Sequence, residues 1–335
     1  MRKIIIPSGY TASLGIRETE LAIKYVKDFF ETALSQKLNL TRVSAPLFVS
    51  SESGLNDNLT GVERPVCFEM LDCGVNCEIV HSLAKWKRQM LRRYGFGIGE
   101  GLYTDMNAIR RDEITDNTHS VYVDQWDWEK IIPESARDVN ILKSIVCDIY
   151  SVIKDTEAMI HTQYGHLDSF LSPEITFITT QELEDRWPGL NAKERENAIA
   201  KKHGSVFIMQ IGGVLNSGHI HDHRAPDYDD WSLNGDILIY YPLLEQALEV
   251  SSMGIRVNAE SLRFQLTESD CMYRTKYPFH KSLLNSDLPQ TIGGGIGQSR
   301  LCMLLLGKIH IGEVQSSVWP DDMLELCKQN NIALL

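Results

Sequence analysis

The chain has 335 residues, of which 43% are hydrophobic and 23% charged, and this composition is ordinary for a globular enzyme of one large domain or two smaller ones. No apolar run approaches the roughly 20 residues that a membrane-spanning helix needs, and Pro7 interrupts the short apolar stretch near the N-terminus, so we expect no membrane partner and a cytoplasmic location. The formal net charge of −12 disfavours nucleic acid as a partner, because an acidic surface repels a phosphate backbone unless its basic residues cluster.

Two long helices and one strand are predicted in the first half of the chain. The segments Glu18 to Leu38 and Val139 to Ile160 repeat apolar residues at the spacing of one helix face, which is typical of amphipathic helices. Between them, Thr41 to Val49 is predicted to be a strand that contains Pro46. Because proline cannot donate a hydrogen bond to a neighbouring strand, Pro46 is expected at a sheet edge or a bulge.

The second half of the chain is predicted to consist mainly of strands. A short charged helix is expected from Asn191 to Lys202, with Asn191 as its N-cap and Gly204 near its end. The predicted strands are Ile175 to Thr180, Ser205 to Ile211, Asp236 to Tyr241 and Leu248 to Val257, and a buried helix is predicted from Leu301 to Leu306. Runs of strands with helices beside them indicate an α+β domain with a largely antiparallel sheet. The sequence shows no internal repeat or obvious linker, so we expect residues 1–335 to form a single domain.

The stretch from Pro289 to Leu306 is rich in glycine. Its glycines are Gly293, Gly294, Gly295 and Gly297. They are expected to form a loop directly before a helix, where a ligand could approach the bare backbone and free N–H groups could bind an anion. Arg300 adds a cation that can stack on a base or hold a phosphate. A packing turn is the alternative, and a Rossmann fingerprint is disfavoured because Arg300 stands where the third glycine would be.

Asp236 and Glu249 form a candidate pair of metal ligands. A hairpin turn centred between Pro242 and Leu243 would place the two carboxylates directly opposite each other, with Cβ atoms about 5 Å apart. Carboxylates at this distance repel each other unless a cation lies between them. Mg²⁺ that also contacts phosphate oxygens is the expected cation, and two exposed carboxylates on strand faces are the alternative.

The segment from Arg224 to Trp231, with the sequence RAPDYDDW, is expected to be a charged loop. Its charged residues are Arg224, Asp227, Asp229 and Asp230. This density of charge suits either a solvated surface or the border of a nucleotide site. The alternating histidines before it, which we expect to be polar loop residues rather than metal ligands, are His219, His221 and His223. The clustered cysteines, which we expect to be reduced thiols rather than a zinc site, are Cys67, Cys73 and Cys77.

Two further stretches carry polar residues that could contact a substrate. Near the start of a predicted helix, Ser82 is a candidate N-cap, and Ser82-x-x-Lys85 matches a motif of serine acyl-transfer enzymes. The Lys-Thr-Gly that accompanies that motif is missing from the sequence, which disfavours a serine nucleophile. In Val121 to Trp128, alternation places Gln125 and Asp127 on one strand face, where they either bind a small zwitterion or line a half-buried surface.

Taken together, these stretches resemble the signature segments of bacterial ammonia-dependent asparagine synthetases. The matching segments are His81–Gln89 (HSLAKWKRQ), Gly99–Thr104 (GEGLYT), His119–Trp128 (HSVYVDQWDW), Arg224–Trp231 (RAPDYDDW), Ser251–Val257 (SSMGIRV) and Pro289–Leu301 (PQTIGGGIGQSRL). They occur in the same order over nearly the whole chain, whereas Leu262 to Ser286 matches little of the family pattern. The resemblance implies the catalytic fold of class II aminoacyl-tRNA synthetases, usually in a homodimer, with Pro46 in the dimer-interface motif.

The resemblance also implies roles for single residues. For ATP it implies Arg110, Arg224, Asp229, Gly295, Gly297 and Arg300. For aspartate it implies Asp57, Lys87, Gln125, Asp127, Ser251, Ser252 and Arg256. For Mg²⁺ it implies Asp236 and Glu249. The residues expected to act in catalysis are Asp57, Lys87, Arg110, Asp229 and Arg300.

The activity implied by the resemblance has two steps. The side-chain carboxylate of L-aspartate attacks the α-phosphorus of ATP to give β-aspartyl-AMP and diphosphate, and ammonia then displaces AMP to give L-asparagine. Mg²⁺, Arg110 and Arg300 would offset the repulsion between the two anions of the first step. In the second step a carboxylate must accept a proton from ammonium, and the sequence leaves Asp57 and Asp229 as candidates.

Two other functions are weighed against this one. A true aminoacyl-tRNA synthetase would need an anticodon-binding module, for which 335 residues with a net charge of −12 leave little room. A catalytically silent sensor would usually lose a metal carboxylate or the nucleotide-binding arginine, yet Asp236, Glu249 and Arg300 are all present. Nothing in the sequence resembles a glutamine amidotransferase domain, so free ammonia is the expected nitrogen donor.

Overall fold

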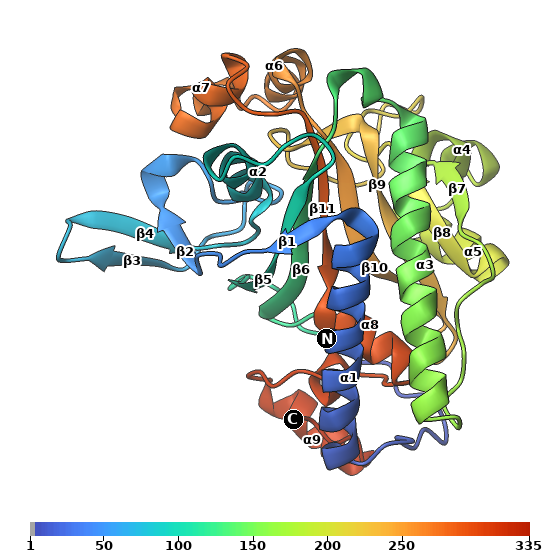
Figure 1. The fold of residues 1–335 in the computed structure, drawn as a ribbon. Helices are drawn as coiled ribbons and strands as arrows, with labels where there is room; N and C mark the ends of the chain where they lie inside the picture. The colour runs from blue at the N-terminus through green and yellow to red at the C-terminus, as the bar shows by residue number, and fades with distance from the viewer. Residues whose placement is uncertain (1–3) are drawn as a thin grey trace.

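The structure is a computed structural model that describes residues 4–335, so Met1, Arg2 and Lys3 of the predicted single domain lie outside the described residues. Its centre is an eight-stranded sheet with the strand order β1-β5-β6-β11-β10-β9-β8-β7 (Figure 1). The strands are β1 (Leu40–Arg42), β5 (Gly101–Ile109), β6 (Tyr122–Ile131), β7 (Thr176–Thr179), β8 (Ser205–Met209), β9 (Asp229–Tyr241), β10 (Gln246–Arg256) and β11 (Thr291–Gly297). The outermost pairings, β1 with β5 and β7 with β8, are parallel, and every pairing between them is antiparallel. The predicted α+β fold with a largely antiparallel sheet is therefore confirmed, while the single domain stays a prediction.

Two long helices, α1 (Ile16–Leu38) and α3 (Val139–Gln163), lie side by side over one face of the sheet (Figure 1). Each has one apolar face, and α3 begins at Asp138, whose side chain accepts hydrogen bonds from two backbone N–H groups of the first turn. Phe30 of α1 packs on Trp126 of β6, with ring centroids 4.5 Å apart. Both helices were predicted, and among residues 4–335 no helix is long and apolar enough to cross a bilayer.

Shorter elements cover the opposite face of the sheet. Leu102 and Met106 of β5 pack in one apolar cluster with Leu91 of α2, whereas Tyr103 packs on the side of α1. A small sheet with the order β2-β4-β3 extends from the side of α2 (Figure 1). These elements are α2 (Ala84–Arg93), β2 (Phe48–Ser50), β3 (Cys67–Met70) and β4 (Val75–Ile79). The other helices and 3₁₀ turns are α4 (Thr180–Arg186), α5 (Ala192–His203), α6 (Ala259–Glu268), α7 (Pro278–Leu284), α8 (Gln298–Leu305), α9 (Asp321–Gln329), η1 (Ser51–Ser53), η2 (Glu134–Ala136), η3 (Met272–Lys276) and η4 (Ile311–Glu313).

The predicted short helix and strands of the second half are present. The side chain of Asn191 caps α5 by accepting a hydrogen bond from Glu194 N, and the helix ends at Gly204. Strands β7, β8, β9 and β10 match the four predicted strands with shifted ends, and β9 begins earlier than expected, at Asp229. This earlier start places part of the charged RAPDYDDW segment in the sheet.

The glycine-rich stretch forms strand β11 instead of the predicted loop, and α8 follows it directly. β11 lies between β6 and β10, where side chains would not fit. A Cβ on Gly293 would lie 2.0 Å from Glu129 Oε2, and one on Gly294 would lie 2.5 Å from Met253 Cβ. Glycine is therefore needed here because neighbouring strands and their side chains occupy the space that a Cβ would take.

Two predictions about strands are wrong. Thr41 to Val49 is not one strand, because Pro46 lies in the connection between β1 and β2, which belong to different sheets. Asp236 does not pair with Glu249, because the turn is centred between Leu243 and Leu244, with Tyr241 opposite Gln246, and not between Pro242 and Leu243. An irregularity in β10 after Glu249 then shifts the register further and places Ser252 opposite Asp236. Glu249 is instead opposite Leu238, so the two carboxylates are diagonal neighbours across the β9–β10 pair.

Candidate active site

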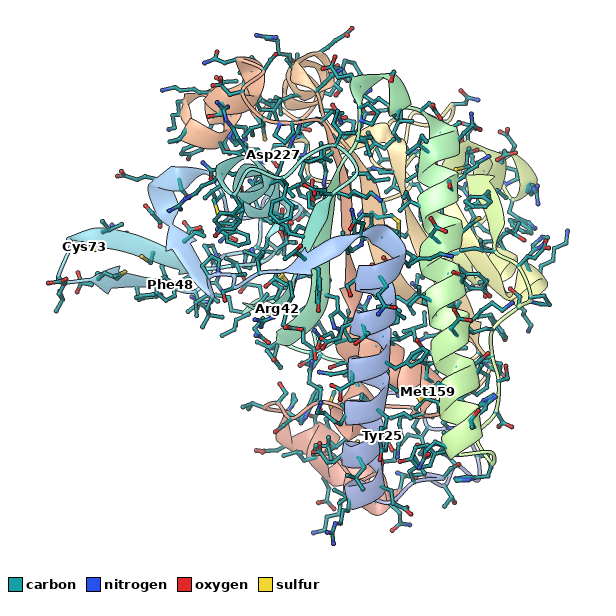
Figure 2. The ribbon with its side chains drawn as sticks, in the orientation of Figure 1. Tyr25, Arg42, Phe48, Cys73, Met159 and Asp227 are labelled. Atoms are coloured by element: carbon teal, nitrogen blue, oxygen red, sulfur yellow. The ribbon has the colours of Figure 1, made fainter. Side chains whose placement is uncertain are left out.

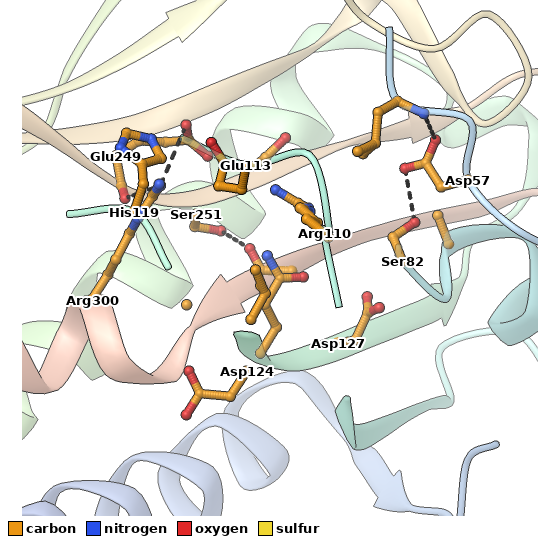
Figure 3. A pocket seen from close by; sticks show the side chains of 18 of the residues that line it. Asp57, Ser82, Arg110, Glu113, His119, Asp124, Asp127, Glu249, Ser251 and Arg300 are labelled. Carbon is orange, nitrogen blue, oxygen red and sulfur yellow. Dashed lines mark hydrogen bonds and ion pairs between the residues drawn. The ribbon is translucent and has the colours of Figure 1, made fainter. Parts of the chain in front are cut away.

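The predicted site residues surround a cavity of about 420 Å³ that β6, β10 and β11 border (Figure 3). Loop residues from the segments 57–63, 110–120 and 222–229 complete its wall. The predicted residues that line it are Asp57, Arg110, Gln125, Asp127, Arg224, Asp229, Glu249, Ser251, Ser252, Arg256, Gly295, Gly297 and Arg300. Lys87 and Asp236 lie behind the wall, in ion pairs with Asp127 and Arg224 respectively. Side chains that are far apart in the sequence therefore meet in one place.

One end of the cavity combines two arginines with two carboxylates. Arg300 donates to the backbone carbonyl of Glu249 at 3.1 Å, and its guanidinium lies 3.7 Å from the Glu249 carboxylate (Figure 3). Arg224 donates to Asp236 at 2.6 Å and to the hydroxyl of Ser252. This end therefore offers both cations and carboxylate oxygens to a ligand.

The Asp236 carboxyl binds a proton more readily than an ordinary aspartate does. Burial, together with the nearby Glu249 carboxylate, raises its pKa to about 7, although Arg224 opposes the shift. Repulsion between two neighbouring carboxylates of this kind is what a hard divalent cation with oxygen ligands would offset. Within residues 4–335 no group of three or more His, Cys, Asp or Glu side chains could hold a metal alone. A metal ion on Asp236 and Glu249 would therefore take its other ligands from phosphate and water.

Two guanidinium groups of the cavity wall retain spare hydrogen-bond donors. The Nε atoms of Arg110 and Arg224 are buried and have no hydrogen-bond partner among the described residues. Arg110 follows β5 directly and lines the cavity (Figure 3). Because a buried unpaired donor is unfavourable, each of these groups is suited to an anionic ligand.

Buried ion pairs form the floor below the other end of the cavity. The Lys87 ammonium contacts Asp127 and two backbone carbonyls, so protein acceptors engage all three of its N–H groups. Arg256 joins Glu129, at 2.7 Å, to Asp229. Burial lowers the pKa of Lys87 and raises that of Asp229. Burial would also raise the pKa of Glu129, but the Arg256 guanidinium holds it below its usual value.

Glu129 is a member of this floor that the sequence analysis missed. The predicted strand ended at Trp128, whereas β6 continues to Ile131. Gln125, Asp127 and Glu129 occupy every second position of β6, so a longer reading of the same alternation would have found the third residue. Its partner Arg256 lies on β10, and no local pattern links the two residues.

Asp57 differs from the other buried carboxylates of the cavity wall, because it has no cationic partner among the described residues. It accepts hydrogen bonds from Ser82 Oγ at 3.0 Å and from Leu59 N at 2.9 Å (Figure 3). The other three buried carboxylates of the wall meet cations, in the pairs Asp124–Lys27, Asp127–Lys87 and Asp229–Arg256. Asp57 is therefore the buried carboxylate that remains available to a cationic ligand.

The motif Ser82-x-x-Lys85 does not form a nucleophilic pair. Leu83 and not Ser82 is the N-cap of α2, so the predicted cap is wrong, and the Ser82 hydroxyl binds Asp57 instead. The Lys85 ammonium donates to Asp227 at 3.1 Å. Serine and lysine are thus each engaged by a different carboxylate, as the missing Lys-Thr-Gly indicated.

The remaining clusters also differ from metal sites. His221 pairs with Glu196 at 3.2 Å, while His219 and His223 are exposed. Cys67, Cys73 and Cys77 are free thiols on the small sheet and its turn. The carboxylates of the RAPDYDDW segment are buried, which excludes the solvated surface considered above; they are Asp227, Asp229 and Asp230.

The fold is that of a class II aminoacyl-tRNA synthetase catalytic domain. Asparaginyl-tRNA synthetase from Pyrococcus horikoshii, solved in complex with asparaginyl-adenylate, matches with a TM-score of 0.66 at 15% identity, over 91% of this chain and 71% of that one. Asparaginyl-tRNA synthetase from Entamoeba histolytica matches with a TM-score of 0.64 at 14% identity, over 90% of this chain and 67% of that one. At these identities the similarity shows the fold alone.

The sequence then defines the family. A family model described as aspartate-ammonia ligase matches residues 17–331. Aspartate–ammonia ligases from Clostridium perfringens and Limosilactobacillus reuteri are 61% and 59% identical to the chain, and the alignments cover 100% and 99% of both sequences. The chain belongs to the aspartate–ammonia ligase family. The resemblance inferred from its signature segments is therefore confirmed.

Proposed function

We propose that the chain forms L-asparagine from L-aspartate, ammonia and ATP through β-aspartyl-AMP, with AMP and diphosphate as the other products. Full-length similarity to aspartate–ammonia ligases supports this reaction. The observation that carries the proposal is a single cavity that holds spare guanidinium donors on Arg110 and Arg224 together with the cation-free carboxylate of Asp57. Such a cavity can bind a phosphate and an amine nucleophile side by side.

In the first step, the side-chain carboxylate of aspartate attacks the α-phosphorus and diphosphate leaves. Both reactants are anions, so cations must offset their repulsion. We assign this role to Arg110, Arg224 and Arg300, because a guanidinium presents paired donors that match phosphate oxygens. Asp229 and the bare backbone of Gly295 and Gly297 complete the proposed ATP site.

Mg²⁺ is the proposed cofactor, with Asp236 and Glu249 as its protein ligands. The raised pKa of Asp236 supports this assignment, because a bound cation would offset the burial of this carboxylate and its repulsion from Glu249. When bound, Mg²⁺ would neutralise charge on the leaving diphosphate. The diagonal placement of the two carboxylates across β9 and β10 keeps Asp236, which lies behind the wall, near Glu249, which lines the cavity.

The other end of the cavity is the proposed aspartate site. The residues assigned to it are Asp57, Lys87, Gln125, Asp127, Ser251, Arg256 and, at the border with the phosphate end, Ser252. Lys87 lies behind the cavity wall and would contribute indirectly, by holding the Asp127 carboxylate in place. Gln125 can lie at this end because Gly295 has no side chain, since a Cβ there would come within 2.5 Å of Gln125 Oε1.

In the second step, ammonia attacks the acyl carbon and AMP leaves. Ammonium dominates at neutral pH, so a base must accept its proton before the nitrogen can attack. The sequence left Asp57 and Asp229 as candidates, and we propose Asp57. Asp229 already meets the Arg256 guanidinium, whereas Asp57 meets a hydroxyl and a backbone N–H. Asp57 can therefore bind ammonium without breaking an ion pair.

We also propose that the chain forms a homodimer in the cytoplasm. Exposed apolar side chains support an interface with a second copy of the chain. They are Ile16, Leu21 and Tyr25 on α1 and Leu47 beside Pro46. Sedimentation of the purified chain measures its mass directly. A monomer at micromolar concentration would contradict the dimer without affecting the proposed reaction.

The test of the proposed function is a product analysis with ATP, L-aspartate and ammonium chloride. We expect asparagine and AMP in equal amounts, and no asparagine when glutamine replaces ammonia. Formation of ADP in place of AMP would contradict an adenylate intermediate. Aspartate-dependent AMP formation that requires tRNA would instead indicate an aminoacyl-tRNA synthetase.

A further inference from the structure

A buried carboxylate that the proposed reaction does not use lies beside the cavity. The Asp227 side chain is fully buried and does not line the cavity. Its Oδ2 atom accepts hydrogen bonds from Lys85 at 3.1 Å, Arg274 at 3.0 Å and His280 at 2.9 Å. Burial alone would raise the pKa of Asp227, but the neighbouring lysine and arginine hold it well below its usual value, so the group stays ionised.

These partners come from three different elements. Lys85 lies on α2, Arg274 on η3 and His280 on α7. Figure 2 labels Asp227 close to α2. A carboxylate buried in this way is favourable only while its partners remain in place, because an unpaired buried charge is costly. The cluster therefore fixes the backbone at Asp227 against α2 and against the segment that contains η3 and α7.

A second contact from the same segment holds the same loop. The amide of Gln265 on α6 donates to the carbonyls of Pro226, at 3.0 Å, and Asp229, at 2.9 Å. Its Oε1 atom accepts from Trp231 N at 2.9 Å. Gln265 is 1% exposed, so water does not compete for these bonds. The loop is thus tied on both sides of Asp227.

The loop that contains Asp227 contributes one cavity residue on each side of it in the chain, Arg224 before it and Asp229 after it. Arg224 reaches Asp236 and Ser252, and Asp229 reaches Arg256. Asp227 lies between them in the chain, with its side chain directed away from the cavity into the ionic cluster. A displacement of Asp227 would therefore move Arg224 and Asp229 of the proposed ATP site together, and through Asp229 it would also disturb Arg256 of the proposed aspartate site.

We propose that Asp227 with Lys85, Arg274 and His280, assisted by Gln265, positions Arg224 and Asp229 for substrate binding. This inference deepens the proposed function and rests on it. It gives a role to the stretch from Leu262 to Ser286, which supplies three of the five residues although it lies outside the signature segments. The five are positioning residues, since they act on the substrates through Arg224 and Asp229.

A merely structural role predicts a different kinetic result. If the cluster only stabilised the fold, its loss would lower the fraction of folded enzyme, and kcat would fall while the KM of the remaining folded enzyme stayed unchanged. If the cluster positions the loop, the folded enzyme itself binds its substrates less tightly, and KM rises. KM and kcat therefore separate the two roles.

The experiment compares His280→Leu with His280→Gln, because the glutamine amide can still donate to Asp227. We expect His280→Leu to raise KM for both ATP and aspartate about tenfold, the effect of one lost hydrogen bond to a charged group. His280→Gln should recover most of this loss. Lys281→Ala, an exposed change on the same helix, is the matched control and should behave as the wild type.

KM values within about twofold of the wild type in His280→Leu, with kcat falling in step with the folded fraction, would overturn the inference. If His280→Leu does not fold, Gln265→Leu removes the second contact without leaving a buried charge, and the same KM criterion applies to it. A wild-type chain that forms no asparagine would argue against the proposed function instead, so the two failures are distinguishable.

Discussion

Gly293 lies opposite Glu129 across the β6–β11 pair, and its missing side chain leaves the space in which Glu129 meets Arg256 at 2.7 Å. A Cβ on Gly293 would lie 2.0 Å from Glu129 Oε2 and 2.6 Å from Arg256 Nη2. A buried ion pair between the two neighbouring strands thus requires glycine at position 293 of β11. This pair in turn holds Asp229 and the floor of the proposed aspartate site.

Gly293→Ala is expected to lower the free energy of unfolding by about 2–5 kcal/mol, because the new methyl group must separate a buried ion pair in a packed sheet. Urea denaturation followed by circular dichroism measures this change. Gly189→Ala is the matched control, since nothing lies within 4 Å of a Cβ at Gly189. Equal stability of the two variants would contradict the steric account of β11.

Asp57→Asn is expected to reduce asparagine formation by more than about tenfold, because an amide cannot accept the ammonium proton. The exchange of diphosphate into ATP should persist at saturating L-aspartate, since the first step needs no base at this position. Asp72→Asn, an exposed change in the turn after β3, serves as the control. Turnover of Asp57→Asn close to that of the wild type would refute the assignment of Asp57.

Arg300→Met is expected to slow adenylate formation about 10- to 150-fold, the range for one lost charge-assisted hydrogen bond in the transition state. Rapid-quench measurement of the first turnover separates this step from product release. Arg93→Met, on the exposed side of α2, removes the same charge away from the cavity. A rate for Arg300→Met within the error of the Arg93→Met rate would show that Arg300 does not act on the phosphate.

His310 should make the chain sensitive to acid. Burial lowers its pKa to about 4 in the folded chain, whereas the unfolded value is near 6.5. Between these values the unfolded state binds the extra proton, so stability falls as the pH drops below about 6.5. By pH 5 this costs about 2 kcal/mol, at 1.36 kcal/mol for each pH unit.

Urea titrations of the wild type and His310→Gln at several pH values between 7 and 5 measure this contribution. The stability difference between the two proteins should change by about 2 kcal/mol over that range, because glutamine does not titrate. His219→Gln, an exposed histidine change, should show no such pH-dependent difference from the wild type. Parallel curves for wild type and His310→Gln would contradict the lowered pKa.

The elements that the sequence predicted are those whose signals are local. α1 and α3 follow from apolar residues repeated on one face, and α5 follows from its Asn191 cap and Gly204 stop. Signals of this kind lie within a few turns of one helix, so a single segment contains them. The resemblance to a known family added the fold, which the structure confirms, and the proposed roles of the site residues.

The predictions that failed depend on partners from elsewhere in the chain. The register of β9 and β10 is set by a turn centred one residue later than predicted and by an irregularity after Glu249, and no local pattern indicates either. The glycines before Arg300 form a strand because they pair with β6 and β10, and they must be glycines because Glu129 and Met253 fill the adjacent space. Asp227 is buried because Lys85, Arg274 and His280 converge on it from three elements. Tertiary contacts, and not local patterns, decide these features.

The measurement that tests the central claim most directly is the exchange of labelled diphosphate into ATP, without ammonia and without tRNA. The proposed reaction predicts exchange that requires both L-aspartate and Mg²⁺, followed by release of asparagine and AMP when ammonia is added. Exchange that is independent of aspartate, or no exchange under conditions in which ammonia supports asparagine synthesis, would contradict a β-aspartyl-adenylate formed before ammonia reacts.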